Sequence, residues 1–226
     1  RMRRTGDTSF FGVGIPNLAG IMSFTDEEIQ RTALANLGWW HHSLHNTIDK
    51  MDKDNLALHL KLYTRWMWDL LTMPVLPFEY SPLASRVTRR LEELAANPVQ
   101  DIDLAGPAAE AKQFEDAVER FDKASTATRE RLNRSEGGAT SEEADLLNQT
   151  MIKLSRILVP ITSTVAGAYG QDRYGHAWQS ATIPSLMPYQ LLGSLDPKSE
   201  EYQTLWVSAV RARNRVGDTL NEATRT

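Results

Sequence analysis

The sequence predicts a mainly α-helical fold, in which a bundle of long helices follows a short strand-and-loop segment. From Leu56 to Leu220, apolar residues recur at spacings of three and four over several long stretches, which is the period of one helix face. Before residue 25, glycines and a proline instead surround short apolar runs, a pattern typical of turns around a strand. We therefore expect long helices after about residue 55 and a strand before residue 25.

The expected strand is Asn17–Phe24, an apolar run interrupted by Gly20. It follows Gly6–Pro16, a glycine-rich segment typical of turns. A single strand is not stable without partner strands. We therefore expect the chain to begin inside a sheet-containing domain, with residues 6–24 as the last part of that sheet.

Local start and stop signals place the helices. Thr25, with Glu28 three residues on, forms a capping box that opens a first helix, and Gly38 is expected to end it. Pro74 is expected to end the next helix, and Ser81 with the proline after it opens another. The broad apolar face around residues 56–70 predicts burial on two sides. The longer helices are expected over Leu56–Leu70, Ser81–Asn97, Pro107–Arg134, residues 140–158 and Ser199–Ala223.

Composition excludes several classes of protein. The chain has 226 residues, no cysteine and a formal net charge of −4. The lack of cysteine rules out disulfides, thiolate catalysis and cysteine-based zinc sites. The acidic balance offers no basic surface for nucleic acid, so no nucleic-acid partner is expected. No apolar run approaches the ~20 residues of a membrane span, and we expect no membrane span in this chain.

The stretch Trp39–Asp52 is the strongest candidate for a site, because three of the five histidines lie in it. Neutral imidazole is the commonest metal ligand, so His41, His42 and His45 beside two aspartates suggest zinc. The alternative is a polar loop at an interface, whose tryptophans pack and whose histidines form hydrogen bonds. A complete zinc site needs three or four ligands, and no second cluster in the sequence supplies the rest. Spacing alone leaves both interpretations open.

The run His42-Ser43-Leu44-His45-Asn46-Thr47 resembles the last zinc-ligand segment of the co-catalytic zinc aminopeptidase and glutamate carboxypeptidase family. That pattern is a histidine, Ser or Thr, two variable residues, an acid and Thr, then a hydrophobic and acidic tail like Ile48–Asp52. The resemblance implies that His42 is a zinc ligand. His45 falls on a variable position, and Asn46 stands where the family has a carboxylate.

Two further segments resemble parts of the same family that surround the substrate. Gly6–Phe10 followed by Gly14-Ile15-Pro16 is similar to the loop and strand that precede the last ligand. The irregular stretch Pro160–Pro197 corresponds to a region beside the active site. The resemblance thus implies a substrate pocket that includes Gly14, Asn17, Tyr174 and His176. Carboxypeptidase members hold an acidic substrate with arginines and a Lys-Tyr pair, and neither is found in the corresponding segments here.

The resemblance implies that the chain contains parts of two domains and belongs to a longer protein, called the parent below. Residues 1–55 correspond to the C-terminal remnant of an α/β zinc-peptidase domain, and residues 56–226 to the transferrin-receptor-like helical dimerisation domain. The family's His-x-Asp ligand segment and its Glu-Glu pair after a strand are absent from the 226 residues. The chain is therefore expected to be the C-terminal part of a zinc exopeptidase and to lack the missing upstream catalytic portion.

In the intact parent, two zinc ions would activate a bridging water and polarise the scissile carbonyl of a peptide substrate, with a glutamate as general base. The 226 residues alone are expected to be inactive and to bind zinc weakly. The helices are expected to form a homodimer around Tyr63, Trp66 and Met67. One alternative is a non-catalytic helical dimerisation or interaction module of a receptor-like relative; another is a free-standing helical protein that binds metal through His42 and His45. The sequence leaves the compartment open, although the parent could be exported.

Overall fold

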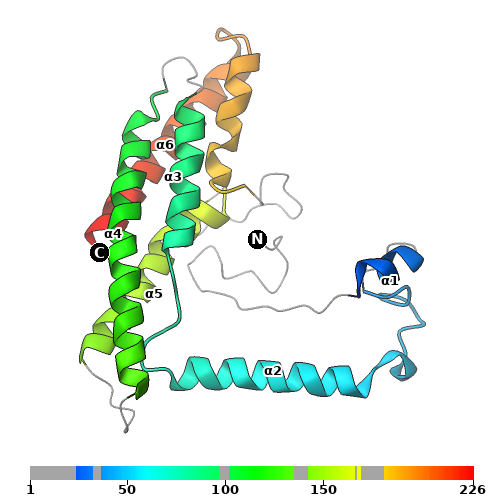
Figure 1. The fold of residues 1–226 in the computed structure, drawn as a ribbon. Helices are drawn as coiled ribbons and strands as arrows, with labels where there is room; N and C mark the ends of the chain where they lie inside the picture. The colour runs from blue at the N-terminus through cyan, green and yellow to red at the C-terminus, as the bar shows by residue number, and fades with distance from the viewer. Residues whose placement is uncertain (1–23, 33–36, 97–101, 135–141, 166, 169–180) are drawn as a thin grey trace. The chain divides into compact units, whose positions relative to one another are not determined.

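The computed structural model describes residues 24–32, 37–96, 102–134, 142–165, 167–168 and 181–226 (Figure 1). In these residues the fold is helical and no strand is present, which confirms the prediction of a mainly helical bundle. The expected glycine-rich loop and nearly all of the expected strand lie outside the described residues. The chain divides into two compact units, one within Leu18–Thr72 and the other covering Met73–Thr226. The domain boundary expected after residue 55 falls inside a helix of the first unit.

The first unit contains α1 (Asp26–Arg31), the short 3-10 helix η3 (Ile48–Lys50) and α2 (Lys53–Thr72). The Thr25 hydroxyl accepts a hydrogen bond from the Glu28 amide at 3.3 Å, so the expected cap of α1 is confirmed. The helix ends at Arg31 and does not continue to Gly38 in the described residues, contrary to the prediction. At its end the Thr32 hydroxyl donates to the Glu28 carbonyl at 2.8 Å, a local bond that competes with helix continuation.

Helix α2 begins at Lys53, three residues before the expected Leu56, and ends before Pro74 as expected, but its apolar residues are not buried. The Asp52 carboxylate caps it by accepting from the Asn55 amide at 2.9 Å, and the helix stops before Pro74. No residue of α2 is buried. The expected burial on two sides is therefore absent from this chain. Large apolar side chains between 41% and 79% exposed are Leu56, Leu58, Leu60, Leu62, Tyr63, Met67, Trp68 and Leu71.

The second unit is a bundle of α3 (Ser81–Ala95), α4 (Ala105–Arg134), α5 (Glu142–Ser163), η4 (Pro184–Ser194) and α6 (Glu200–Arg225). Helix α4 packs against α3 and α6, while α5 and η4 pack on α6 (Figure 1). The Ser199 hydroxyl accepts from the Tyr202 amide at 3.1 Å and so caps α6, whose expected range began at this residue. The largest fully buried side chains of this core include Leu91, Ile102, Phe114, Met151, Leu158, Leu186, Tyr189 and Leu220.

The chain enters the bundle through a segment that side chains of α4 and α5 hold in place. Val75 is fully buried, and Asn148 of α5 bonds to the backbone on either side of it. The Asn148 Oδ1 accepts from the Leu76 amide at 2.8 Å, and its Nδ2 donates to the Pro74 carbonyl at 2.9 Å. Asp122 of α4 accepts from the amide of Ser81, at 2.8 Å, and so caps α3. The start of the bundle therefore depends on contacts between residues far apart in the sequence.

The stretch Pro160–Pro197 is more regular than predicted where the structure describes it. Helix α5 continues through Pro160 to Ser163, and η4 occupies part of the second half of the expected irregular region. Four of the η4 segment's apolar side chains, Ile183, Leu186, Tyr189 and Leu192, are almost fully buried. Burial of this apolar segment against the bundle supports an ordered 3-10 helix where prolines and glycines predicted a loop. None of the described helices is long and apolar enough to cross a membrane.

Candidate functional site

His42 lies in a series of tight turns between α1 and η3. The His41 amide donates to the Gly38 carbonyl at 3.1 Å, and the Ser43 amide donates to the Trp40 carbonyl at 3.0 Å. The Ser43 hydroxyl also donates to the Trp40 carbonyl at 2.7 Å. His42 itself has φ of +59°, a left-handed conformation uncommon for any residue other than glycine. The turns thus hold the histidine in a backbone conformation that costs on the order of 1–3 kcal/mol.

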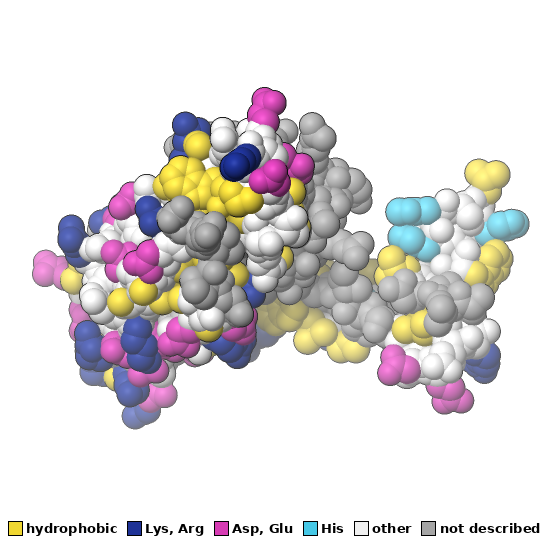
Figure 2. All heavy atoms as spheres, turned by 90° about the horizontal axis from the view of Figure 1, so that it is seen from above, with side chains coloured by type: hydrophobic (Ala, Val, Ile, Leu, Met, Phe, Trp, Pro, Cys, Tyr) yellow, Lys and Arg dark blue, Asp and Glu magenta, His cyan; other side chains and the backbone are white. Residues whose placement is uncertain are grey.

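Aromatic rings surround this turn and orient the histidines. The His41 and His42 rings stack with centroids 3.9 Å apart, and Trp39 lies 5.5 Å from the His45 ring. Trp39 and Trp40 meet edge to face at 5.8 Å. Figure 2 shows the histidine side chains of this segment at the surface, near apolar side chains. His42 is exposed and so is accessible to a ligand or to further protein.

Gly38 is required for this arrangement. Its φ is +88°, and a Cβ added to it would lie 2.6 Å from two atoms of the Trp40 ring. Any other residue would be strained in the backbone and would also push the Trp40 ring away. The glycine that the sequence indicated as a helix stop therefore forms the first turn of the histidine segment and allows Trp40 to pack closely.

The acids that follow the histidines are engaged in local structure. Asp49 accepts hydrogen bonds from the Lys50 ammonium and the Thr47 hydroxyl, and these bonds lower the pKa of its carboxyl group. Asp52 caps α2. Among the described residues, no group of three or more His, Asp or Glu side chains is placed to hold a metal ion. A catalytic zinc usually has three protein ligands, so any further ligands for an ion at His42 would have to come from outside the described part of the segment.

The other residues expected at the site cannot be placed beside His42. Gly14, Asn17, Tyr174 and His176, the expected substrate pocket, all lie outside the described residues. Of the expected site, the structure thus describes His42 and its neighbours His41 and His45.

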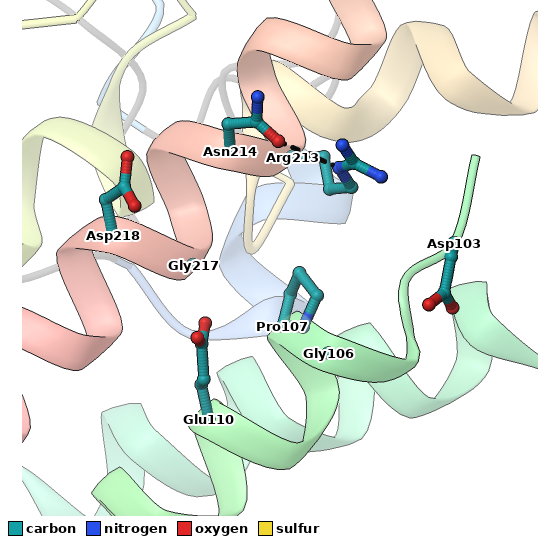
Figure 3. Close-up of a pocket in the computed structure, with 8 residues that line it drawn as sticks. All are labelled: Asp103, Gly106, Pro107, Glu110, Arg213, Asn214, Gly217 and Asp218. Carbon is teal, nitrogen blue, oxygen red and sulfur yellow. Dashed lines mark hydrogen bonds between the residues drawn. The ribbon is translucent and has the colours of Figure 1, made fainter.

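A second candidate is a cleft of about 370 Å³ in the bundle, between the start of α4 and the middle of α6 (Figure 3). Three carboxylates and one guanidinium group line it, and sequence reasoning did not find it because its residues come from distant positions. Most of these groups already have partners: Asp103 accepts from the Ala105 amide at 2.8 Å, and the Arg213 Nε donates to the Asn214 side chain at 3.0 Å. The lining residues are Asp103, Gly106, Pro107, Glu110, Arg213, Asn214, Gly217 and Asp218.

Glu110 of α4 contacts α6 in this cleft. Its Oε1 accepts from the Asn221 Nδ2 at 3.2 Å. Its Oε2 is buried, has no hydrogen-bond partner among the described residues, and lies where a Cβ on Gly217 would come within 2.7 Å. The absence of a side chain at Gly217 therefore makes room for the Glu110 carboxylate. This arrangement explains the contact between α4 and α6 without a bound ligand.

Comparisons with known proteins give no match: no family model, no curated protein and no solved structure resembles the chain.

Proposed function

We propose that this chain is the C-terminal part of a zinc-dependent exopeptidase, similar to an aminopeptidase or a glutamate carboxypeptidase. In this proposal His42 is one zinc ligand and the helices hold two copies of the protein together. The position of His42 in the ligand segment supports the assignment. His42 is also exposed, on a turn that backbone hydrogen bonds and ring stacking hold in place. Such a position suits a ligand of a metal ion whose other ligands lie outside this segment.

The observation that carries the proposal is the exposure of α2, in the same compact unit as His42. A helix that is apolar over most of its circumference is normally buried in the interior of a domain. Here none of its residues is buried, and its exposed side chains include Trp68, Met67 and Leu71. Folded monomers rarely expose an apolar patch larger than about 300–600 Å². The exposed apolar side chains of α2 therefore support the proposal that another protein segment or a second copy packs against the unit that carries His42.

The chain supplies only part of a peptidase site. A catalytic zinc needs about three protein ligands and an open position, and a general base must reach the attacking water. Among the described residues, His42 belongs to no group of three or more His, Asp or Glu side chains that could hold one ion. The remaining ligands and the base would therefore come from the missing upstream catalytic portion. The 226-residue chain alone is expected to lack peptidase activity and to bind zinc weakly.

The test compares this chain with a longer protein that includes the upstream portion, on a panel of aminoacyl and peptidyl substrates with added zinc. The longer protein should hydrolyse a peptide substrate, and His42→Ala should abolish the activity because a ligand is lost. His45→Ala is the matched control, because His45 is an exposed imidazole three residues away on a position that is variable in the family pattern. It should keep most of the activity.

Two outcomes would contradict the proposal. Zinc-dependent turnover by the 226-residue chain, lost on His42→Ala, would indicate a self-contained site. Full activity of the longer protein with His42→Ala would show that His42 is not a zinc ligand. Circular dichroism tests whether both variants keep the helical content of the unsubstituted longer protein. For variants that do, a lower zinc content after dialysis indicates that a zinc ligand has been lost.

The dimer part of the proposal rests on the apolar face of α2, on which Tyr63 is 41% and Met67 62% exposed. A stable isologous contact buries at least about 1,000 Å² in total, and a helix face of this length is suited to supply it. Light scattering at high micromolar concentration should show a dimer, and Met67→Glu should weaken it. A monomeric wild-type chain would contradict this part and leave the peptidase part standing.

A further inference from the structure

We draw no further inference here: the strongest candidate, the cleft between the start of α4 and the middle of α6, carries nothing because Asp103 and Arg213 are bonded within the fold and one unpartnered oxygen of the half-buried Glu110 does not by itself define a ligand.

Discussion

Replacement of Asn148 should destabilise the bundle more than any other polar change on α5. Its side chain bonds both to the Leu76 amide and to the Pro74 carbonyl, at 2.8 and 2.9 Å. Between these two residues Val75 is fully buried. The leucine in Asn148→Leu has similar size but no polar atom. The variant therefore leaves one backbone donor and one backbone acceptor without their partner.

The magnitude follows from the two lost bonds. A buried donor or acceptor left unpaired costs about 1–3 kcal/mol. The segment is half-buried, so water recovers part of this cost, and we expect Asn148→Leu to lose about 2–4 kcal/mol of unfolding free energy. For a domain of this size, that loss corresponds to a melting temperature lower by about 5–12 °C.

The measurement is urea and thermal unfolding followed by far-ultraviolet circular dichroism. Gln149→Leu is the matched control, because Gln149 is the exposed next residue of the same helix and should change stability by less than about 0.5 kcal/mol. If Asn148→Leu unfolds at the same urea concentration as Gln149→Leu, the two bonds do not hold the entry segment and the reasoning fails.

Three further changes test other parts of the fold. Gly217→Ala places a Cβ 2.7 Å from the Glu110 Oε2, the far end of a flexible side chain, so Glu110 should turn aside and its bond to Asn221 should weaken. In chemical unfolding, Gly217→Ala should therefore be less favourable than Gly106→Ala, which has open space around it and should be neutral or stabilising; equal effects would contradict the close approach. Leu91→Ala in the core should cost about 2–5 kcal/mol in chemical unfolding, and Leu60→Ala on α2 should cost much less at protein concentrations low enough to keep the chain monomeric. The Thr128 hydroxyl, then Arg131, lower the pKa of Glu143 below its ordinary 4.5, so its stabilising effect is present above that pH and lost as the pH falls through the lowered pKa. Glu143→Gln should therefore lower the melting temperature near pH 7, and its difference from the unsubstituted protein should shrink as the pH falls through the lowered pKa. A difference in melting temperature that stays constant with pH would count against the bond between Thr128 and Glu143.

The helices were predictable because their signals are local. The spacing of apolar residues and the capping hydroxyls act over three or four positions, so the Thr25 cap appears as expected and α6 begins where the sequence placed it, next to Ser199. Prolines likewise mark the end of α2 and the start of α3. Where a distant residue competes with a local one, the prediction was wrong. Ser81 was expected to cap α3, but the Asp122 carboxylate does so and also accepts from the Ser81 hydroxyl.

The expected site was predictable only in part. The sequence singled out the histidine segment, and the structure places His42 on an exposed turn. The stacking of His41 on His42, and the close contact of Trp40 with Gly38, depend on backbone angles that residue spacing does not reveal. The assignment of His42 as a zinc ligand stays a prediction.

The sequence by itself determined the places of the long helices and the apolar face of each, because both follow from interactions within a few residues, but it did not reveal the 3-10 helix η4. Only the tertiary structure decided which apolar faces are buried: those of α3 to α6 pack together, whereas α2 remains exposed. The tertiary structure also decided that Asn148 bonds to the backbone of residues 74 and 76 and that Glu110 lies against Gly217. In each pair the two partners are more than 70 positions apart in the sequence. Such contacts depend on how helices cross, and helix crossing depends on the fit of whole surfaces rather than on local sequence.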